Sequence, residues 1–223
     1  MEWIIYNGDT QMIQVDEMFS TPIFHFRASN HEEIKTYIKK DIYPEFEKIG
    51  YNSKHCNVFS DYFPGAPKLD QTKLSNLYQE DMFQLLEFVG FDRNKKWDIY
   101  PAFWYNITGK GGWQEQHDHI SGPLPSQFSG IHYVQFDENE HQAAEFESPV
   151  CSLMRSMMPC ENKDNAPDFF RHLSAVPKTI KEGDIIVFPS YLKHAVNIQE
   201  SEKERISIAF NMGIWSHEFI NIN

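Results

Sequence analysis

The sequence predicts a mainly β fold with flanking helices, of the α+β class, and two observations support this. From residue 96 onward, short runs rich in β-branched and aromatic residues alternate with turn residues, which is typical of β-sandwiches and barrels. Residues 1–95 instead carry apolar positions at helical spacing. The 223 residues, 41% of them apolar, suffice for one buried core. We therefore expect a single domain over residues 1–223, with 1–95 as a partly helical support and 96–215 as the β core.

Two helices are predicted in the first part. The first follows an N-cap at Ser29-Asn30, and its apolar residues recur at helical spacing until Gly50. The second covers about 69–89 and has an apolar stripe that stops before a glycine. A short extended segment at 19–26 precedes them, because the residue before a proline avoids helical geometry. We interpret both helices as packing elements rather than functional ones.

About six strands and one shorter strand are predicted in the second part. Turns such as 109–112 and 182–184 separate them. Residues 150–171 form an irregular stretch that we interpret as an insertion loop, either a lid or binding loop or a disordered segment. The predicted strands are 97–108, 129–136, 143–147, 173–177, 184–188 and 205–215, with the shorter one near 195–198.

Composition excludes several classes of partner. A net charge of −12 and a pI near 5.2 leave no basic surface for tracking phosphates, so we expect no nucleic-acid binding. No run approaches the ~20 apolar residues that cross a bilayer, and the start lacks a targeting pattern, so we expect no membrane association. The three cysteines, Cys56, Cys151 and Cys160, contain no Cys-x-x-Cys pair, which fits reduced thiols in the cytoplasm better than disulfides or zinc. The oligomeric state is left open.

The most informative motif is His117-x-His119, which follows a glycine-rich turn. In extended backbone, residues i and i+2 point to the same side, so both imidazoles can face one metal ion while Asp118 points away. A distant strand would supply the third ligand, for which the sequence offers His194. Two alternatives remain open. The pair can arise by chance on a surface loop, since the chain has ten histidines, or a β-bulge can turn Asp118 inward in place of His119.

A polar strand face near the end of the chain offers a site for an anion. Alternation over 205–211 places Arg205, Ser207 and Asn211 on one face and apolar residues on the other. A guanidinium fork matches the two oxygens of a carboxylate, and a neighbouring hydroxyl adds a third hydrogen bond. The sequence therefore predicts a carboxylate receptor. The alternative is a solvated outer face on which Arg205 pairs with Glu202 or Glu204.

Several motifs occur together in a recognisable order. They are Phe19-x-Thr21-Pro22, Trp104-Tyr105-Asn106, His117-x-His119, Ser129-Gly130-Ile131-His132-Tyr133, His194 after Gly-Asp-Ile-Ile-Val-Phe-Pro-Ser-Tyr-Leu-Lys, and Arg205-x-Ser207. This set resembles the 2-oxoglutarate and Fe(II)-dependent oxygenases, whose core is a double-stranded β-helix, a jelly roll of the cupin type. Within them it is similar to a prolyl-hydroxylase-like oxygenase subfamily common in bacteria and marine phages. The resemblance spans roughly residues 17–213 and is most specific over 183–211.

The resemblance implies a site, residue by residue. It assigns His117 and His194 as ligands of Fe(II), and Arg205 with Ser207 as the anchor for the distal carboxylate of 2-oxoglutarate. The superfamily usually has Asp or Glu where this chain has His119. Three neutral imidazoles would leave the iron more cationic, which favours the anionic co-substrate but leaves open a His-ligated chemistry without it. Further donors to 2-oxoglutarate implied by the resemblance are Tyr133, Asn106 and Asn211.

The implied function is that of a 2-oxoglutarate- and Fe(II)-dependent dioxygenase that hydroxylates a small molecule or peptide. An amino-acid or peptidyl side chain is the expectation by family analogy, with succinate and CO2 as co-products. We expect the protein in the cytoplasm, or in the host cytoplasm if a phage encodes it. Two alternatives remain: a cupin-like metalloenzyme that does not use 2-oxoglutarate, and a non-catalytic jelly-roll module for binding or structure.

Other histidines and aromatic residues are interpreted by position. Only one of the neighbours His132 and Tyr133 can face the iron, and we expect Tyr133. The isolated histidines are interpreted as surface or capping residues: His25, His31, His55, His141, His172 and His217. Four aromatic residues near the predicted site in sequence either line a pocket or belong to the core: Trp104, Trp113, Tyr191 and Trp215.

Overall fold

The computed structural model describes residues 3–5, 12–14, 21–92, 94–120, 126–149 and 174–216, with the backbone alone at 3–5, 12–14 and Ser216. The predicted insertion loop at 150–171 lies outside these residues, as do His172 and His217. None of the described helices is both long and apolar enough to cross a bilayer.

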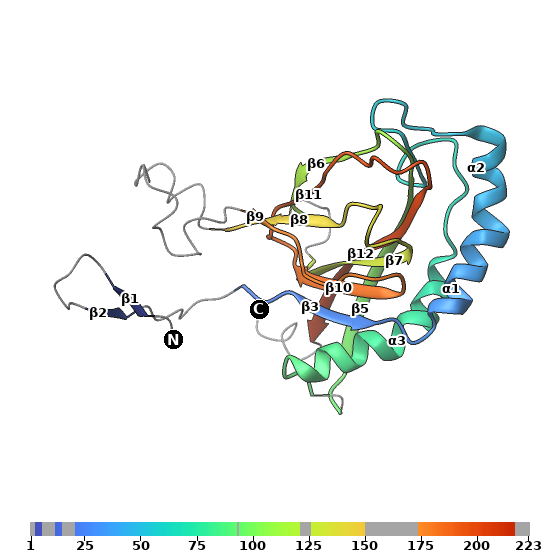
Figure 1. Ribbon diagram of the computed structural model, residues 1–223. Helices are drawn as coiled ribbons and strands as arrows, with labels where there is room; N and C mark the ends of the chain where they lie inside the picture. Colours follow the sequence, from blue (N-terminus) through green and yellow to red (C-terminus); the bar gives the residue numbers. More distant parts are fainter. Residues whose placement is uncertain are drawn as a thin grey trace.

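Two antiparallel sheets pack against each other in the β core (Figure 1). The larger has the strand order β3-β10-β7-β12-β5-β4 and the smaller has β6-β11-β8-β9. The mainly β fold with flanking helices is therefore confirmed. The larger sheet contains β3 (Phe24–Arg27), β10 (Asp184–Pro189), β7 (Phe128–Gln135), β12 (Arg205–Ser216), β5 (Trp97–Thr108) and β4 (Val58–Ser60). The smaller contains β6 (Gln114–His117), β11 (His194–Val196), β8 (Ala144–Glu147) and β9 (Ser174–Ala175), and β1 (Trp3–Ile5) pairs separately with β2 (Met12–Gln14).

The predicted strands largely coincide with the observed ones. β5 has the predicted bounds, and β12 extends one residue beyond them. Two short strands of the β core have no counterpart in the prediction, β4 with three residues and β6 with four. The Gln-Glu-Gln-His sequence of β6 lacks alternating apolar residues, and it becomes a strand by pairing with β11.

The larger sheet is buried on both faces because its central strands alternate between two apolar cores. In β10, Ile185 packs toward the helices, while Ile186 and Phe188 pack toward the smaller sheet. In β12, every apolar residue at the even positions from 206 to 214 belongs to the core on the helix side. The odd-numbered residues from 205 to 211 therefore face the space between the two sheets.

Helices cover the outer face of the larger sheet (Figure 1). They are α1 (His31–Tyr37), the π-helical turn η1 (Ile38–Ile42), α2 (Tyr43–Ile49) and α3 (Gln71–Phe88). The first predicted helix is confirmed as the continuous run of α1, η1 and α2, which ends at Gly50 with a φ of 72°. Asn30 occupies the N-cap position without a side-chain cap. Its Nδ2 instead donates to the carbonyl of Leu77 at 2.7 Å, which joins α1 to α3.

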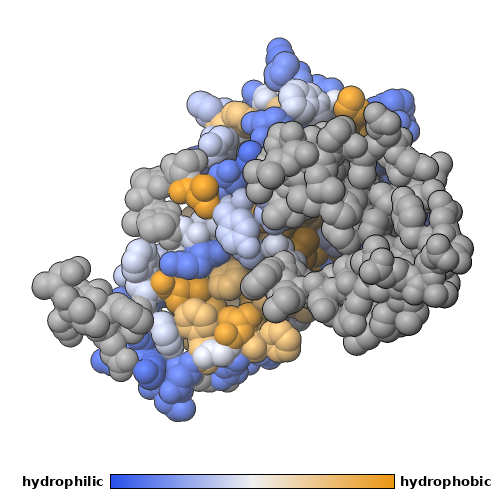
Figure 2. All heavy atoms as spheres, turned by 90° about the vertical axis from the view of Figure 1, so that its left-hand side faces the viewer, coloured by the Kyte–Doolittle hydropathy of each residue, from blue (hydrophilic) through white to orange (hydrophobic). Residues whose placement is uncertain are grey.

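An apolar area lies where β3 and β7 begin, on the face that Figure 2 shows. There the ring of Phe24 contacts those of Phe128 and Phe88, with centres 6.1 and 6.2 Å apart. Phe24 and Phe128 also pack against the core on the helix side. Aromatic contacts therefore close that core at this end of the sheet.

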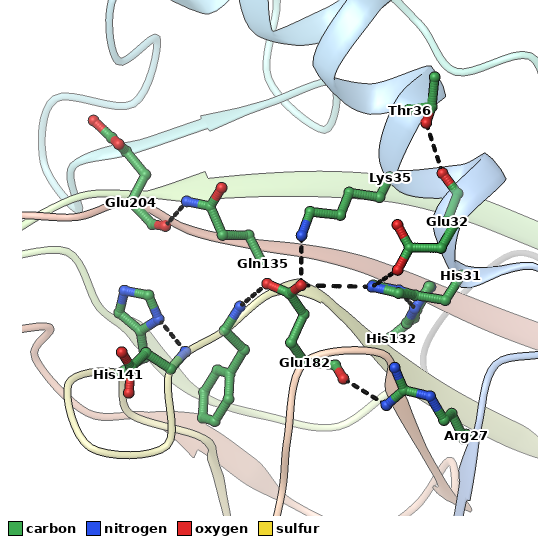
Figure 3. A network of polar contacts seen from close by, with 12 residues as sticks. Arg27, His31, Glu32, Lys35, Thr36, His132, Gln135, His141, Glu182 and Glu204 are labelled. Atoms are coloured by element: carbon green, nitrogen blue, oxygen red, sulfur yellow. Dashed lines mark hydrogen bonds and ion pairs between the residues drawn. The ribbon is translucent and has the colours of Figure 1, made fainter.

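A buried chain of hydrogen bonds links α1, α3 and β7. Tyr78 Oη lies 2.6 Å from His132 Nδ1, and His132 Nε2 lies 3.0 Å from His31 Nδ1. If Tyr78 donates to His132 and His132 to His31, the remaining N–H of His31 points at Glu182. The Glu182 carboxylate lies 3.7 Å from His31 Nε2 and also pairs with Lys35 (Figure 3). In this order His132 accepts one hydrogen bond and donates another, whereas His31 accepts one and its Nε2 has no hydrogen-bond partner among the described residues.

The isolated histidines differ from one another in the structure. His31 is 4% exposed, so its interpretation as a surface or capping residue is wrong. It is buried because α1 presses it against β7, which a single isolated histidine in the sequence does not reveal. His141 is also buried, at 6% exposed, so it is not a surface residue; its Nδ1 accepts from the N–H of Asp137 at 2.9 Å within a turn.

Protonation of His132 should make the protein less stable in mild acid. Burial, followed by the charge of His31, lowers the pKa of His132 from 6.5 to about 3. Its contribution to stability is therefore complete above pH 6.5 and is lost as the pH falls toward about 3, because only the unfolded chain takes up the proton. At about pH 5 the loss is on the order of 2 kcal/mol. Urea unfolding near neutral pH and at about pH 5 measures the difference in the free energy of unfolding between the two conditions. In His132→Gln this difference should be smaller by on the order of 2 kcal/mol. The same difference as in the wild type would contradict the prediction.

Candidate metal centre

Three histidines meet at the edge of the smaller sheet. His117 ends β6 and His194 begins β11, and the two are register partners on neighbouring strands. His119 follows the end of β6, where its N–H donates to the carbonyl of Ser190 at 2.9 Å. The candidate ligand nitrogens of the three rings all lie within 4.8 Å of one another. The structure therefore brings together the three residues that the sequence predicts as metal ligands.

Hydrogen bonds orient two of these rings. The Nδ1–H of His117 donates to the carbonyl of Glu115 at 2.8 Å, and the Nδ1–H of His194 donates to that of Leu192 at 3.1 Å. Nε2 of each ring is then the unprotonated nitrogen that can bind a metal, and Gln114 Nε2 lies 3.4 Å from that of His117. His119 Nε2 lies 3.4 Å from His194 Nε2. Metal–imidazole bonds of about 2.1 Å at right angles place two ligand nitrogens about 3 Å apart, so this pair needs only a small adjustment.

Two of the rings are neutral at physiological pH. Burial, followed by the charge of His117, lowers the pKa of His119 to about 4 and that of His194 to about 3. Neutral imidazole is the form that binds a metal ion. Asp118 does not belong to the cluster, and its Oδ1 accepts from the N–H of Ile120 at 3.4 Å. The geometry therefore favours His119 over the alternative in which a bulge turns Asp118 inward.

Arg205 is buried with an unsatisfied donor. It is 3% exposed, and its Nε has no hydrogen-bond partner among the described residues. Burial lowers the pKa of Arg205, while contact with Tyr133, whose ring centre is 5.3 Å from Cζ, opposes this. The alternative of a solvated outer face is wrong: Glu202 pairs with Lys110, and Glu204 accepts from a tyrosine hydroxyl of α2. A buried guanidinium N–H without a partner is costly, so this site suits an anionic ligand.

A cavity of about 540 Å³ connects the histidine cluster to this arginine. His117, His119 and Arg205 all line it. A small adjoining cavity shares part of its wall and is also lined by His194 and Ser207. The residues predicted to hold the metal and those predicted to anchor a carboxylate therefore border the same space.

Two asparagines predicted as further donors also border this space. Asn106 lines both cavities. Asn211 lines the larger one, and its Oδ1 accepts from Ser129 Oγ at 2.8 Å. That bond fixes the amide orientation and leaves its N–H groups as donors. Their role toward a co-substrate stays a prediction.

Tyr133 is placed differently from these asparagines. Its side chain points between the sheets while His132 points toward the helices, as expected from strand alternation. The Tyr133 hydroxyl accepts from the N–H of Ala144 at 3.1 Å, and its ring lies against Arg205. Among the described wall residues it lines neither cavity, so it supports Arg205 from behind.

Aromatic residues form part of the remaining wall. Trp104 and Trp113 line the larger cavity, whereas Tyr191 and Trp215 are exposed and lie outside its lining. Wall residues that the sequence analysis missed include Cys56, Tyr62, Phe63, Gln114 and Glu115. The first three flank β4, which reaches the site because it pairs with β5. No motif marks them, since that pairing is long-range.

Comparison with known proteins identifies this arrangement. Residues 102–211, just under half of the chain, match a family model described as "Putative 2OG-Fe(II) oxygenase". The matched segment runs from β5 to β12 and contains the histidine cluster and Arg205. The matched segment is that of a 2-oxoglutarate/Fe(II)-dependent oxygenase. No curated protein sequence matches this oxygenase.

Solved structures share the fold of this oxygenase. A prolyl-4-hydroxylase from Pseudomonas putida matches with a TM-score of 0.52 at 11% identity, covering 86% of this chain and 92% of that one. The non-haem α-ketoglutarate-dependent carbocyclase SnoK from nogalamycin biosynthesis matches at 0.56 and 14%, covering 86% and 79%. HygX from Streptomyces hygroscopicus, with nickel, 2-oxoglutarate and hygromycin B bound, matches at 0.51 and 13%, covering 86% and 83%. The predicted double-stranded β-helix core is therefore confirmed.

Fe(II) and 2-oxoglutarate are the metal and co-substrate of this oxygenase family, and the residues present fit both. Neutral imidazoles that converge on one point suit Fe(II). The unsatisfied Nε of Arg205 suits a carboxylate of the co-substrate.

Proposed function

We propose that this oxygenase is a 2-oxoglutarate-dependent dioxygenase that hydroxylates an organic substrate and releases succinate and CO2. In this proposal, Fe(II) is bound by the histidine cluster and the distal carboxylate of 2-oxoglutarate by Arg205 and Ser207. The observation that carries it is the buried, unsatisfied Nε of Arg205 on the wall of a cavity that also borders the three convergent imidazoles.

Each group has a distinct role. Fe(II) and 2-oxoglutarate, when bound, supply the oxidising chemistry. The three histidines hold the metal through neutral nitrogens and leave other coordination positions open. Arg205 and Ser207 orient the co-substrate, and their burial strengthens the charge-assisted hydrogen bonds by excluding water. Because the triad carries no charge, the anionic co-substrate is what offsets the charge of the metal.

The alternatives explain less of the structure. A cupin-like enzyme that does not use 2-oxoglutarate would leave the buried Arg205 without an anionic ligand. A non-catalytic jelly-roll module would have no use for three imidazoles that converge beside a cavity. A cavity of about 540 Å³ suits a small molecule or a single side chain, so we propose an amino-acid or peptidyl side chain as the substrate. We place the reaction in the cytoplasm, where Cys56 stays a thiol.

Anaerobic addition of Fe(II) and then 2-oxoglutarate should produce a visible metal-to-ligand charge-transfer band. On admission of oxygen, the protein should slowly convert 2-oxoglutarate to succinate even without its prime substrate, because in this proposal the metal and co-substrate sites need no contribution from it. Zn(II) in place of Fe(II) is the control and should give neither signal, since it has no redox chemistry. Stoichiometric iron binding without the band would contradict the role of 2-oxoglutarate and favour the cupin-like alternative.

A further inference from the structure

The larger cavity has a second wall that the metal and co-substrate residues do not occupy. Apart from Asn211, this wall consists of the residues that line the larger cavity but not the smaller one. Tyr62 and Glu115 are exposed, so it faces the entrance. Among its described members, none is a lysine or an arginine. Its aromatic and acidic members are Tyr62, Phe63, Trp113, Glu115 and Asp118.

The two carboxylates of this wall have no cationic partner among the described residues. Some glutamates elsewhere pair with lysines, as Glu140 does with Lys203 at 2.7 Å and Glu45 with Lys48 at 2.6 Å. Neither Glu115 nor Asp118 forms an ion pair with a described lysine or arginine. Both carboxylates therefore remain available to a cation that enters the cavity.

The aromatic residues of this wall suit the same ligand. Tyr62 is 75% exposed and contacts Phe63 edge-on, with ring centres 5.6 Å apart. Trp113 is held in place by the ring of His55, whose centre lies 5.5 Å away. Aromatic faces beside carboxylates bind organic cations, because the ring attracts the charge and its surface covers an apolar stem.

The net charge of the site with Fe(II) and 2-oxoglutarate bound also favours a cationic ligand. The two carboxylates of 2-oxoglutarate offset the charge of Fe(II), and the remaining charges on the described wall are Arg205, Glu115 and Asp118. One positive and two negative groups leave an excess of one negative charge, which a monocation would neutralise. We propose, on the basis of the function proposed above, that the prime substrate is an organic cation. It carries an ammonium or guanidinium group at the outer carboxylates and an apolar stem that extends along the rings toward the histidine cluster.

Three six-carbon ligands that differ only in their head group test this proposal: hexylammonium, hexan-1-ol and hexanoate. Isothermal titration of each into the full-length protein, with and without anaerobic Fe(II) and 2-oxoglutarate, measures the preference. Hexylammonium should bind about tenfold more tightly than hexanol, as expected from one cation–π contact and one charge pair, and hexanoate should bind most weakly to the loaded protein. The preference should decrease with added salt.

Glu115→Gln and Trp113→Leu should each remove most of the preference for hexylammonium. Glu138→Gln removes the same charge from an exposed residue outside the cavity wall, so this variant should keep the preference for hexylammonium. Any of three results would overturn the proposal. Hexylammonium and hexanol could bind equally well, hexanoate could bind more tightly to the loaded protein, or neither variant could change the preference for hexylammonium. The charge-transfer band is recorded in the same samples. A band without cation preference refutes the substrate class alone, whereas cation preference without a band refutes the co-substrate and leaves the cation site standing.

Discussion

Arg205→Met should weaken 2-oxoglutarate binding roughly a hundredfold, about 3 kcal/mol, because truncating one partner of a buried charged pair costs on the order of 2–5 kcal/mol. Methionine keeps the length of the side chain but has no donor. The folded protein should lose little stability, because losing the contact with the Tyr133 ring is offset by no longer burying a guanidinium whose Nε has no partner among the described residues. Titration of the charge-transfer band with 2-oxoglutarate measures the affinity, and thermal unfolding measures the stability.

Two further variants make this result specific. Arg205→Lys keeps the charge but not the planar fork, so it should restore only part of the affinity. Arg27→Met removes the same charge from an exposed position outside the cavity wall and should leave the affinity unchanged. An Arg205→Met protein that binds 2-oxoglutarate as tightly as the wild type would show that the carboxylate binds elsewhere.

His194→Ala should abolish stoichiometric Fe(II) binding. Loss of a residue that merely orients a ligand costs about 10- to 100-fold in metal affinity, and loss of a ligand itself costs more. His119→Ala should have the same effect if the three imidazoles bind the metal together. Anaerobic equilibrium dialysis followed by iron analysis measures both.

Asp118→Asn tests the alternative ligand and His25→Ala serves as the matched control. His25 lies on β3, where its Nε2 is 2.9 Å from Asp184 Oδ2 on β10. It is not part of the cavity wall, so its removal should leave iron binding intact. Retained iron in Asp118→Asn, together with its loss in His119→Ala, is the expected pattern. The opposite pattern would assign Asp118 as the ligand.

Strand alternation made the inner face of β12 predictable. A period of two is local, so residues 205–211 alone showed that Arg205, Ser207 and Asn211 share a face opposite the apolar one. The same reasoning placed His117 and His119 on one side, although only His117 lies within a strand. His119 reaches the cluster through a backbone hydrogen bond to Ser190, a contact between segments far apart in the sequence.

Burial and the cavity wall were less predictable. His31 has no sequence feature that distinguishes it from an exposed histidine, and it is buried because α1 packs against β7. Tyr133 has the predicted orientation, but its place behind Arg205 depends on how β7 and β12 are paired. Tyr62 and Phe63 join the wall only because β4 pairs with β5.

The sequence by itself determined the fold class, most strand and helix positions, and the identity of the candidate metal ligands and carboxylate anchor. These depend on local periodicity, turn residues and short motifs, which need no knowledge of distant contacts. The tertiary structure decided which histidines are buried, that the nitrogens of three rings come within 4.8 Å of one another, and that Arg205 Nε is left without a partner among the described residues. It also decided which residues complete the wall. Those properties depend on the packing of segments remote in sequence, where small shifts determine which groups meet and which stay in water.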